Sequence, residues 1–181
     1  GKSLNERYER LVLTSATLSV AGEFDHLLRR WGLSAQTPTL SLTSPFDFAA
    51  AVCLLAITDA PDPREAAYAD FLARTLEQLV AATKRKSLAL FTSYALLKQV
   101  AALVQGPLSE AGVEVTAQGR DGAAGALLRR FRAPGPALLL GTASFWEGVE
   151  LPGDELELLV VTRLPFPVPN DPLVEARGEA Q

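Results

Sequence analysis

Short apolar runs recur along the chain, and segments with helical spacing of apolar and polar residues lie between them. Strands in the middle of a parallel sheet are nearly all apolar, because helices cover both faces of such a sheet. Six runs fit this pattern. They predict strands at residues 10–13, 52–57, 88–91, 113–115, 137–140 and 156–161.

Helical patterns fill most of the gaps and predict helices at residues 23–31, 64–83, 95–104 and 125–131. Asp62 and Pro63 provide a cap and a first-turn residue for the second of these helices, and Ser93 precedes the third. The second helix carries an apolar face that should pack on the sheet, made of Phe71, Leu72, Leu76, Leu79 and Val80. Alternating strands and helices predict an α/β fold with a doubly wound, mainly parallel sheet and helices on both faces.

Composition supports one compact domain over residues 1–181, because 48% of the residues are hydrophobic and can form a buried core. The formal net charge is −4 and the isoelectric point is near 5.1. This balance excludes an overall basic surface for nucleic acid. Any contact with nucleic acid would therefore be local and built from backbone amides, hydroxyls and a few cations.

The single cysteine, Cys53, lies inside an apolar run and is predicted to be a small core residue. One cysteine excludes a disulfide within the chain and leaves a metal cluster without ligands, so no metal site is predicted. His26, the only histidine, is predicted on the surface of an amphipathic helix. The longest apolar stretch, residues 49–57, is far shorter than the roughly 20 residues of a membrane helix. The first residues also lack a signal-peptide layout, which predicts a soluble, cytoplasmic protein without membrane contact.

Small polar residues follow four of the predicted strands, at the edge where open α/β sheets bind their ligands. They are Thr14, Ser15 and Thr17, then Thr92 and Ser93, then Gln118 and Gly119, and finally Thr142 and Ser144. Hydroxyls and free amides at helix N-termini hold phosphates without reading bases. Any one of these residues alone is better explained as a helix cap. Their recurrence at four strand ends favours a shared phosphate-binding edge.

Four motifs occur in a fixed order: LTSATL at residues 13–18, LFTSY at 90–94, GTASFWEGVELPG at 141–153 and RLPFPVPNDPL at 163–173. Together they resemble the C-terminal motor domain of DinG-type DNA helicases, which are bacterial relatives of the XPD-like superfamily 2 enzymes. The resemblance extends over nearly the whole chain. It implies a RecA-like fold and a role as the second motor domain of an ATP-dependent helicase.

The first two motifs carry roles that the resemblance implies. LTSATL is similar to motif III of the family, so Thr14, Ser15 and Thr17 would couple the nucleotide state to the grip on DNA. LFTSY is similar to motif IV, so Thr92, Ser93 and Tyr94 would face the DNA backbone. The Tyr94 ring is able to stack on a base. A half-buried aromatic residue at the start of a helix explains Tyr94 equally well.

GTASFWEGVELPG is similar to motif V, which implies that Thr142 and Ser144 contact DNA phosphates. Residues of the nucleotide cleft between the two motor domains would be Glu147, Gly148 and Glu150. The family often has Asp where this chain has Glu150, and the longer arm makes the geometric role of this residue an open question. Phe145 and Trp146 are either a wedge beside the strand or anchors of the loop, and the core position is favoured for Trp146.

Gln118 and Arg163 complete the predicted DNA-binding set. Arg163 follows the last predicted strand and could pair with a phosphate or with a carboxylate at the same edge. The basic run at residues 84–86 ends a predicted helix, where cations complement the helix dipole.

Some parts of a helicase have no counterpart in this sequence. Residues 1–3, GKS, match the end of a phosphate-binding loop but lack the preceding strand and glycine. An acidic DEAH-like box is absent, and the chain ends before the arginine-bearing motif VI, so the domain is expected to be truncated there. An N-terminal motor domain of the parent chain would supply the phosphate-binding loop and the Mg²⁺ ligand.

The implied function is therefore that of a partial helicase. The parent would use ATP and Mg²⁺ and move five-prime to three-prime on single-stranded DNA, whereas this piece alone would not hydrolyse ATP or bind a cofactor. An alternative is a non-catalytic RecA-like protein-interaction module, suggested by the acidic balance and the proline-rich tail. A small-molecule α/β enzyme is disfavoured, since the chain has no Gly-rich dinucleotide loop and no nucleophile with its base.

Overall fold

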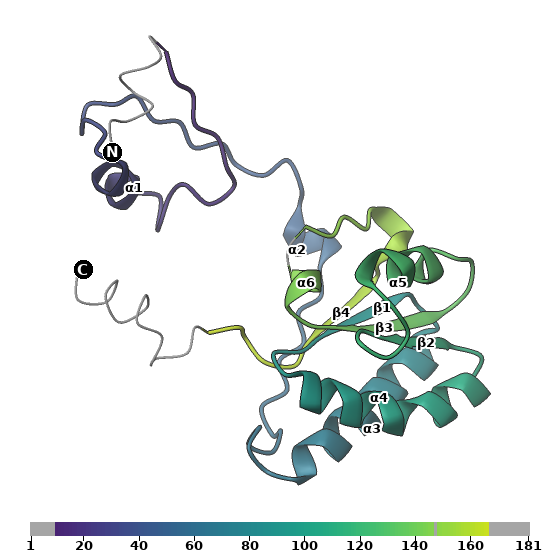
Figure 1. Cartoon of the computed structure of the whole chain (residues 1–181). Helices are drawn as coiled ribbons and strands as arrows, with labels where there is room; N and C mark the ends of the chain where they lie inside the picture. Colours follow the sequence, from purple (N-terminus) through teal and green to yellow (C-terminus); the bar gives the residue numbers. More distant parts are fainter. Residues whose placement is uncertain (1–9, 147, 167–181) are drawn as a thin grey trace. The chain divides into compact units, whose positions relative to one another are not determined.

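The computed structural model describes residues 10–146 and 148–166 and divides into two compact units, Gly1–Ala56 and Ile57–Gln181 (Figure 1). The first unit contains two short helices, α1 (Asp25–Trp31) and α2 (Phe48–Ala51). The second contains the sheet. The assignment of residues 1–181 to one domain stays a prediction.

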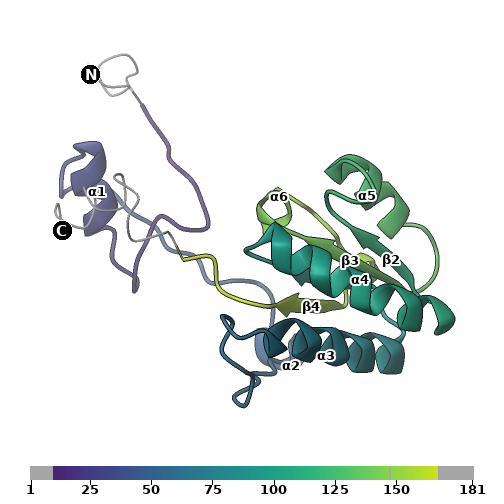
Figure 2. The ribbon, with the colours of Figure 1, turned by 60° about the horizontal axis from the view of Figure 1, so that its bottom comes forward.

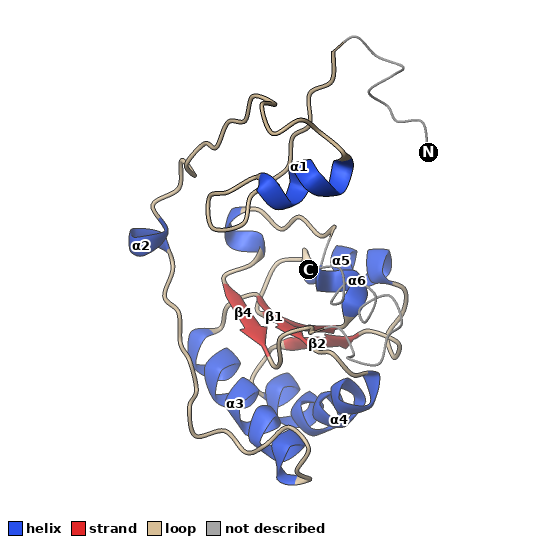
Figure 3. Cartoon of the chain, turned by 90° about the vertical axis from the view of Figure 1, so that its left-hand side faces the viewer, coloured by secondary structure: helices blue, strands red, loops and turns tan. Residues whose placement is uncertain are grey.

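Four parallel strands form the sheet of the second unit: β1 (Ser87–Leu90), β2 (Glu114–Ala117), β3 (Ala137–Gly141) and β4 (Leu158–Val161). Their order across the sheet is β2-β3-β1-β4, with β3 and β1 in the middle. The strands are shown in red in Figure 3. This parallel sheet with helices packed on it confirms the predicted α/β fold class.

Helices cover both faces of the sheet, as Figure 2 shows for α3 (Ala67–Thr83), α4 (Tyr94–Glu110), α5 (Ala124–Phe131) and α6 (Ala143–Trp146). Successive strand residues point to opposite faces. Leu138 and Leu140 accordingly join the core under α3 and α4, whereas Leu139 joins a smaller core under α5 and α6. A short 3₁₀ turn, Gly153–Glu155, leads into β4. No helix in the described ranges has the length and apolar character needed to cross a bilayer.

The helices predicted for the second unit have buried apolar faces, but each of them begins or ends at a different residue than predicted. Leu72, Leu76 and Val80 of α3 are buried, which confirms the predicted apolar face. The helix begins at Ala67 rather than residue 64, because Asp62 accepts the backbone N–H of Arg64 and so caps a separate turn. Helix α4 extends beyond residue 104 and includes Pro107, since the buried Leu108 continues its apolar face.

Two predicted strands are wrong. Residues 10–13 and 52–57 are not strands, and Cys53 is exposed rather than part of the core. An apolar run becomes a strand only where a neighbouring strand supplies hydrogen bonds. All four strands of the described residues lie in the second unit. His26 in α1 is exposed, as predicted.

Candidate functional site

The parallel sheet brings predicted site residues from four separate segments to one edge. Parallel strands end at the same side, so the residues after them stand in the order of the strands. Across the order β2-β3-β1-β4, this row reads Gln118, then Thr142 and Ser144, then Thr92, Ser93 and Tyr94, and finally Arg163. The seven residues predicted to bind DNA therefore share one edge of the second unit.

Three of these residues form a hydrogen-bond network at the ends of β2 and β3. The side-chain oxygen of Gln118 accepts from the backbone N–H of Thr142 at 2.7 Å and from the Thr142 hydroxyl at 2.9 Å. The side-chain nitrogen of Gln118 donates to the Ser144 hydroxyl at 2.6 Å. Gln118 and Thr142 are only 9% and 4% exposed, whereas Ser144 is exposed. Of the three, Ser144 is the one that faces solvent.

The segment after β1 starts helix α4 and carries three polar side chains. The Ser93 hydroxyl caps the helix by accepting the backbone N–H of Leu96 at 3.5 Å, which confirms the predicted capping role. Tyr94, the first residue of α4, is 48% exposed. Its ring lies over Gly119, where an added Cβ would stand 3.4 Å from the ring and φ is +79°. The positive φ favours glycine at residue 119, whereas the distance to the ring is an ordinary van der Waals contact.

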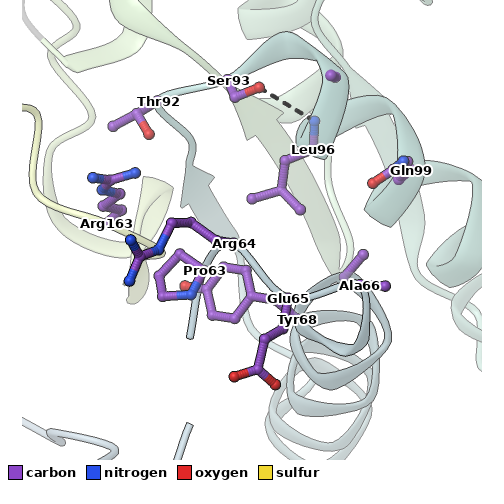
Figure 4. Close-up of a pocket in the computed structure, with 12 residues that line it drawn as sticks. Pro63, Arg64, Glu65, Ala66, Tyr68, Thr92, Ser93, Leu96, Gln99 and Arg163 are labelled. Atoms are coloured by element: carbon purple, nitrogen blue, oxygen red, sulfur yellow. Dashed lines mark hydrogen bonds between the residues drawn. The ribbon is translucent and has the colours of Figure 1, made fainter. Parts of the chain in front are cut away.

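A pocket of about 400 Å³ lies beside Thr92, Ser93 and Arg163 (Figure 4). In Figure 4, the side chains of Arg163 and Arg64 lie on the same side of the pocket as Thr92. The guanidinium of Arg64 is bound to Asp62 at 2.7 Å and 3.0 Å, and these hydrogen bonds hold the pKa of the Asp62 carboxyl well below its usual range. Arg163 has no ion pair among the described residues. Arg163 is exposed, and its charge contributes to lowering the pKa of the Asp62 carboxyl.

Tyr68 fixes the chain next to Arg163. Its hydroxyl donates to the carbonyl oxygen of Thr162 at 2.6 Å, and burial raises the pKa of this phenol. Arg64 and Gln99 also line the pocket and were not among the predicted site residues. The spacing of Asp62 and Arg64 is a signal of a local ion pair, but no pattern in the sequence places Gln99 near Arg163.

Phe145 and Trp146 anchor the loop after β3 in the core. Phe145 is buried, and the indole N–H of Trp146 donates to the carbonyl oxygen of Phe91 at 3.3 Å. Both side chains pack in the core under α5 and α6. Trp146 is partly buried and packs against this core, which supports its predicted role as an anchor of the loop.

The remainder of this loop is tied to the end of α5. Arg132 donates to the carbonyl oxygen of Glu150 at 2.9 Å and to the carboxylate of Glu155 at 2.9 Å. Gly148 and Glu150 are exposed. Glu147 lies outside the described residues. The assignment of Glu147, Gly148 and Glu150 to a nucleotide cleft stays a prediction.

The residues of LTSATL belong to the first unit. Thr14, Ser15 and Thr17 are exposed, and the Ser15 hydroxyl lies 3.2 Å from both the backbone nitrogen and the hydroxyl of Thr17. Their coupling role stays a prediction. Residues 1–3 and the part of RLPFPVPNDPL from residue 167 onward lie outside the described residues.

The basic run at residues 84–86 makes contacts within the protein. Lys84 donates to the carbonyl oxygen of Ala111, and Lys86 donates to that of Arg132 at 3.0 Å. Arg85 pairs with Glu157. Lys84 caps the C-terminus of α3, which agrees with the predicted structural role of this run.

Acid should weaken the turn that follows Gln118. Asp121 accepts from the backbone N–H of Ala117 at 2.8 Å, and hydrogen bonds from Arg120 lower the pKa of the Asp121 carboxyl. An unfolded Asp binds its proton near pH 4. The stabilisation is therefore complete above about pH 4 and is lost as the pH falls toward the lower pKa of the folded state.

We expect Asp121→Asn to be less stable than the unmodified chain at neutral pH, and the difference to shrink as the pH falls from about 5 to about 3. Urea denaturation at each pH would measure the free energy of unfolding of both proteins. A difference that stays constant over this pH range would contradict the assignment.

Comparisons with known proteins agree with the motifs. The family described as helicase C-terminal domain matches residues 76–181. The chain is 37% identical over 178 residues to the 3'-5' exonuclease DinG of Bacillus subtilis, which covers 96% of this chain and 19% of that protein. It is 36% identical over 168 residues to the ATP-dependent DNA helicase YoaA of Escherichia coli, covering 93% of this chain and 26% of that protein.

The ATP-dependent helicase DinG of Mycobacterium tuberculosis is 36% identical over 172 residues, covering 93% of this chain and 25% of that protein. The chain thus spans between a fifth and a quarter of the length of these relatives. The match over residues 76–181 includes all four strands and the whole row of polar strand ends. The chain belongs to the helicase C-terminal domain family, and its relatives include proteins named DinG and YoaA.

Proposed function

We propose that the chain is the second motor domain of an ATP-dependent helicase that moves five-prime to three-prime on single-stranded DNA. The observation that carries this proposal is the row of polar groups from Gln118 to Arg163 along one edge of the sheet. The relatives named as helicases support it. A DNA substrate also implies a protein of the cytoplasm, as the sequence predicts.

The row extends across the sheet. Neighbouring strands lie about 4.8 Å apart, so four strands extend the row over about 14 Å. A single strand of DNA that follows the row could therefore contact it through more than one phosphate. The contacts would come mainly from hydroxyls and amides, which suits a chain with a net charge of −4.

ATP would bind between this chain and an N-terminal motor domain of the parent protein. That domain would hold the phosphates and Mg²⁺, and Gly148 and Glu150 of this chain would form the facing wall with Glu147. Thr14, Ser15 and Thr17 would couple nucleotide state to DNA grip. Positioning and electrostatics from both domains would drive phosphoryl transfer. We propose that the chain alone is inactive as an ATPase.

Arg163→Gln should weaken binding to a fluorescently labelled oligothymidylate. A cation that neutralises one phosphate adds about 0.7 to the slope of log affinity against log salt for single strands. We therefore expect the affinity at low salt to fall several-fold and the slope to become shallower by about 0.7. Fluorescence anisotropy over a salt series would measure both quantities.

Arg85→Gln is the matched control, because it removes the same charge just before β1, at the opposite edge of the sheet. It should leave the salt slope unchanged. Equal slopes for all three proteins would contradict a phosphate contact at Arg163. Absence of DNA binding by the unmodified chain at low salt would contradict the proposed function and favour the protein-interaction module.

A further inference from the structure

We propose that Ser144 donates the phosphate hydrogen bond at the end of β3, and that Gln118 is a positioning residue that directs the Ser144 hydroxyl toward this task. The inference rests on the proposed function, since it names the group that meets the DNA backbone. It also changes the predicted role of two residues. Gln118 and Thr142 would hold Ser144 in place through the hydrogen-bond network and would not contact DNA themselves.

The orientation of the Gln118 carboxamide follows from its partners. The backbone N–H of Thr142 can only donate, so the group facing it at 2.7 Å has to be the carboxamide oxygen. The carboxamide NH₂ then has to face Ser144, where it donates to the hydroxyl oxygen at 2.6 Å. A flipped amide would place its NH₂ group against the backbone N–H of Thr142, so that two donors would face each other. One backbone amide therefore determines the direction of both side-chain bonds.

The hydroxyls of Thr142 and Ser144 consequently differ in whether they can donate a hydrogen bond to a phosphate. The Thr142 hydroxyl lies 2.9 Å from a carboxamide oxygen that has no hydrogen, so Thr142 has to donate its proton there. Thr142 is also buried, and it has no proton left for a phosphate. The Ser144 oxygen accepts its bond from Gln118, which leaves the Ser144 proton free. Among the described residues, Ser144 donates this proton to no partner.

The position of Ser144 suits an anionic oxygen. Ser144 is exposed at the start of the short helix α6, and the buried Phe145 that follows it fixes the local backbone. Gln118 is itself fixed, because its backbone N–H donates to the carbonyl oxygen of Leu140 at 2.9 Å. The Ser144 side chain is thus restrained by its own backbone and by the hydrogen bond from Gln118. A restrained hydroxyl loses little conformational freedom on binding, which favours contact with a phosphate.

The test compares three single variants for binding to the labelled oligothymidylate. Ser144→Ala should lower the affinity about tenfold or more, the range for one hydrogen bond to a charged group. It should leave the salt slope unchanged, because a hydroxyl releases no counterion. Thr142→Val keeps the shape of the residue and should change the affinity less than twofold. Gln118→Met, neutral and similar in length, should lower the affinity as much as Ser144→Ala.

The double variant Gln118→Met, Ser144→Ala separates positioning from direct contact. If Gln118 acts through Ser144, adding Gln118→Met to Ser144→Ala causes no further loss. If the loss of affinity in the double variant equals the product of the two single losses, Gln118 contacts DNA itself and the inference is overturned. A loss at Thr142→Val with none at Ser144→Ala would also overturn it, and this pair decides the question even if Gln118→Met does not fold.

The outcomes distinguish the inference from the proposed function. If the unmodified chain binds and Ser144→Ala binds equally well, the inference is wrong and the function stands. If the unmodified chain does not bind at low salt, both are wrong. The expected result is binding that depends on Ser144 and Gln118 together and not on the Thr142 hydroxyl.

Discussion

Replacing Leu139 with alanine is expected to lower the free energy of unfolding by about 2–5 kcal/mol, the range for a buried leucine that leaves a cavity. Leu139 lies in the middle of β3, between β2 and β1, and none of its surface is exposed. It packs with Leu127, Phe131 and Phe145 in the core under α5 and α6. The central place of Leu139 in this core makes a remaining cavity the expected result of the replacement.

Leu159→Ala is the matched control for this change. Leu139, Leu88 and Leu159 are partners in register across three strands, so their side chains share one side of the sheet. Leu159 is 52% exposed, and its replacement should cost less than about 1 kcal/mol. Urea denaturation followed by circular dichroism would compare the two. Equal losses would show that the exposed side of β4 is covered in solution.

Gly141→Ala is expected to lower the free energy of unfolding by about 1–3 kcal/mol, as overpacking does in a dense core. An added Cβ at Gly141 would lie 2.6 Å from the ring of Phe145 and 2.8 Å from its Cβ. Moving the ring alone cannot relieve the second of these distances. The whole turn from β3 into α6 would have to shift.

Gly125→Ala provides the control for the same exchange. Gly125 lies in α5, and apart from the helix backbone and the neighbouring residues, the nearest atom to an added Cβ there is the end of the flexible Arg129 side chain, at 3.9 Å. Removing a glycine from a helix should raise stability by up to about 0.5–1 kcal/mol. Opposite signs in thermal denaturation are therefore expected for the two glycines. A stabilising effect of Gly141→Ala would contradict the close approach of Phe145.

The pattern of apolar residues predicts the sheet because β1, β2 and β3 are almost wholly buried and one side of β4 is partly buried. It fails at residues 10–13 and 52–57, which are mostly apolar but are not strands. Residues 52–57 are also exposed, so apolar character alone determines neither burial nor the presence of a neighbouring strand. The helix ends differ for a local reason, since Asp62 caps a turn that precedes α3.

Position at a strand end predicts which residues share the edge, because parallel strands all end on the same side. It cannot predict which hydroxyl is free, as Thr142 and Ser144 show. Both residues carry a hydroxyl in the same motif, and they differ in their burial and in the direction of their bonds to Gln118. Gln118 is 24 residues from Thr142 in the sequence. The local ion pair of Arg64 and Asp62 follows from their spacing, but its location next to Arg163 depends on tertiary structure.

The bond between Gln118 and Ser144 has a mechanical consequence. Ser144 is attached through the main chain to β3 and through the side chain of Gln118 to β2. A force applied at Ser144 is therefore divided between two adjacent strands. Each of these strands resists along its own axis, through the ladder of hydrogen bonds from Glu114 to Ala117 that joins them. A force on the Ser144 hydroxyl is therefore resisted by the hydrogen bonds between β2 and β3, and not only by the loop that carries Ser144.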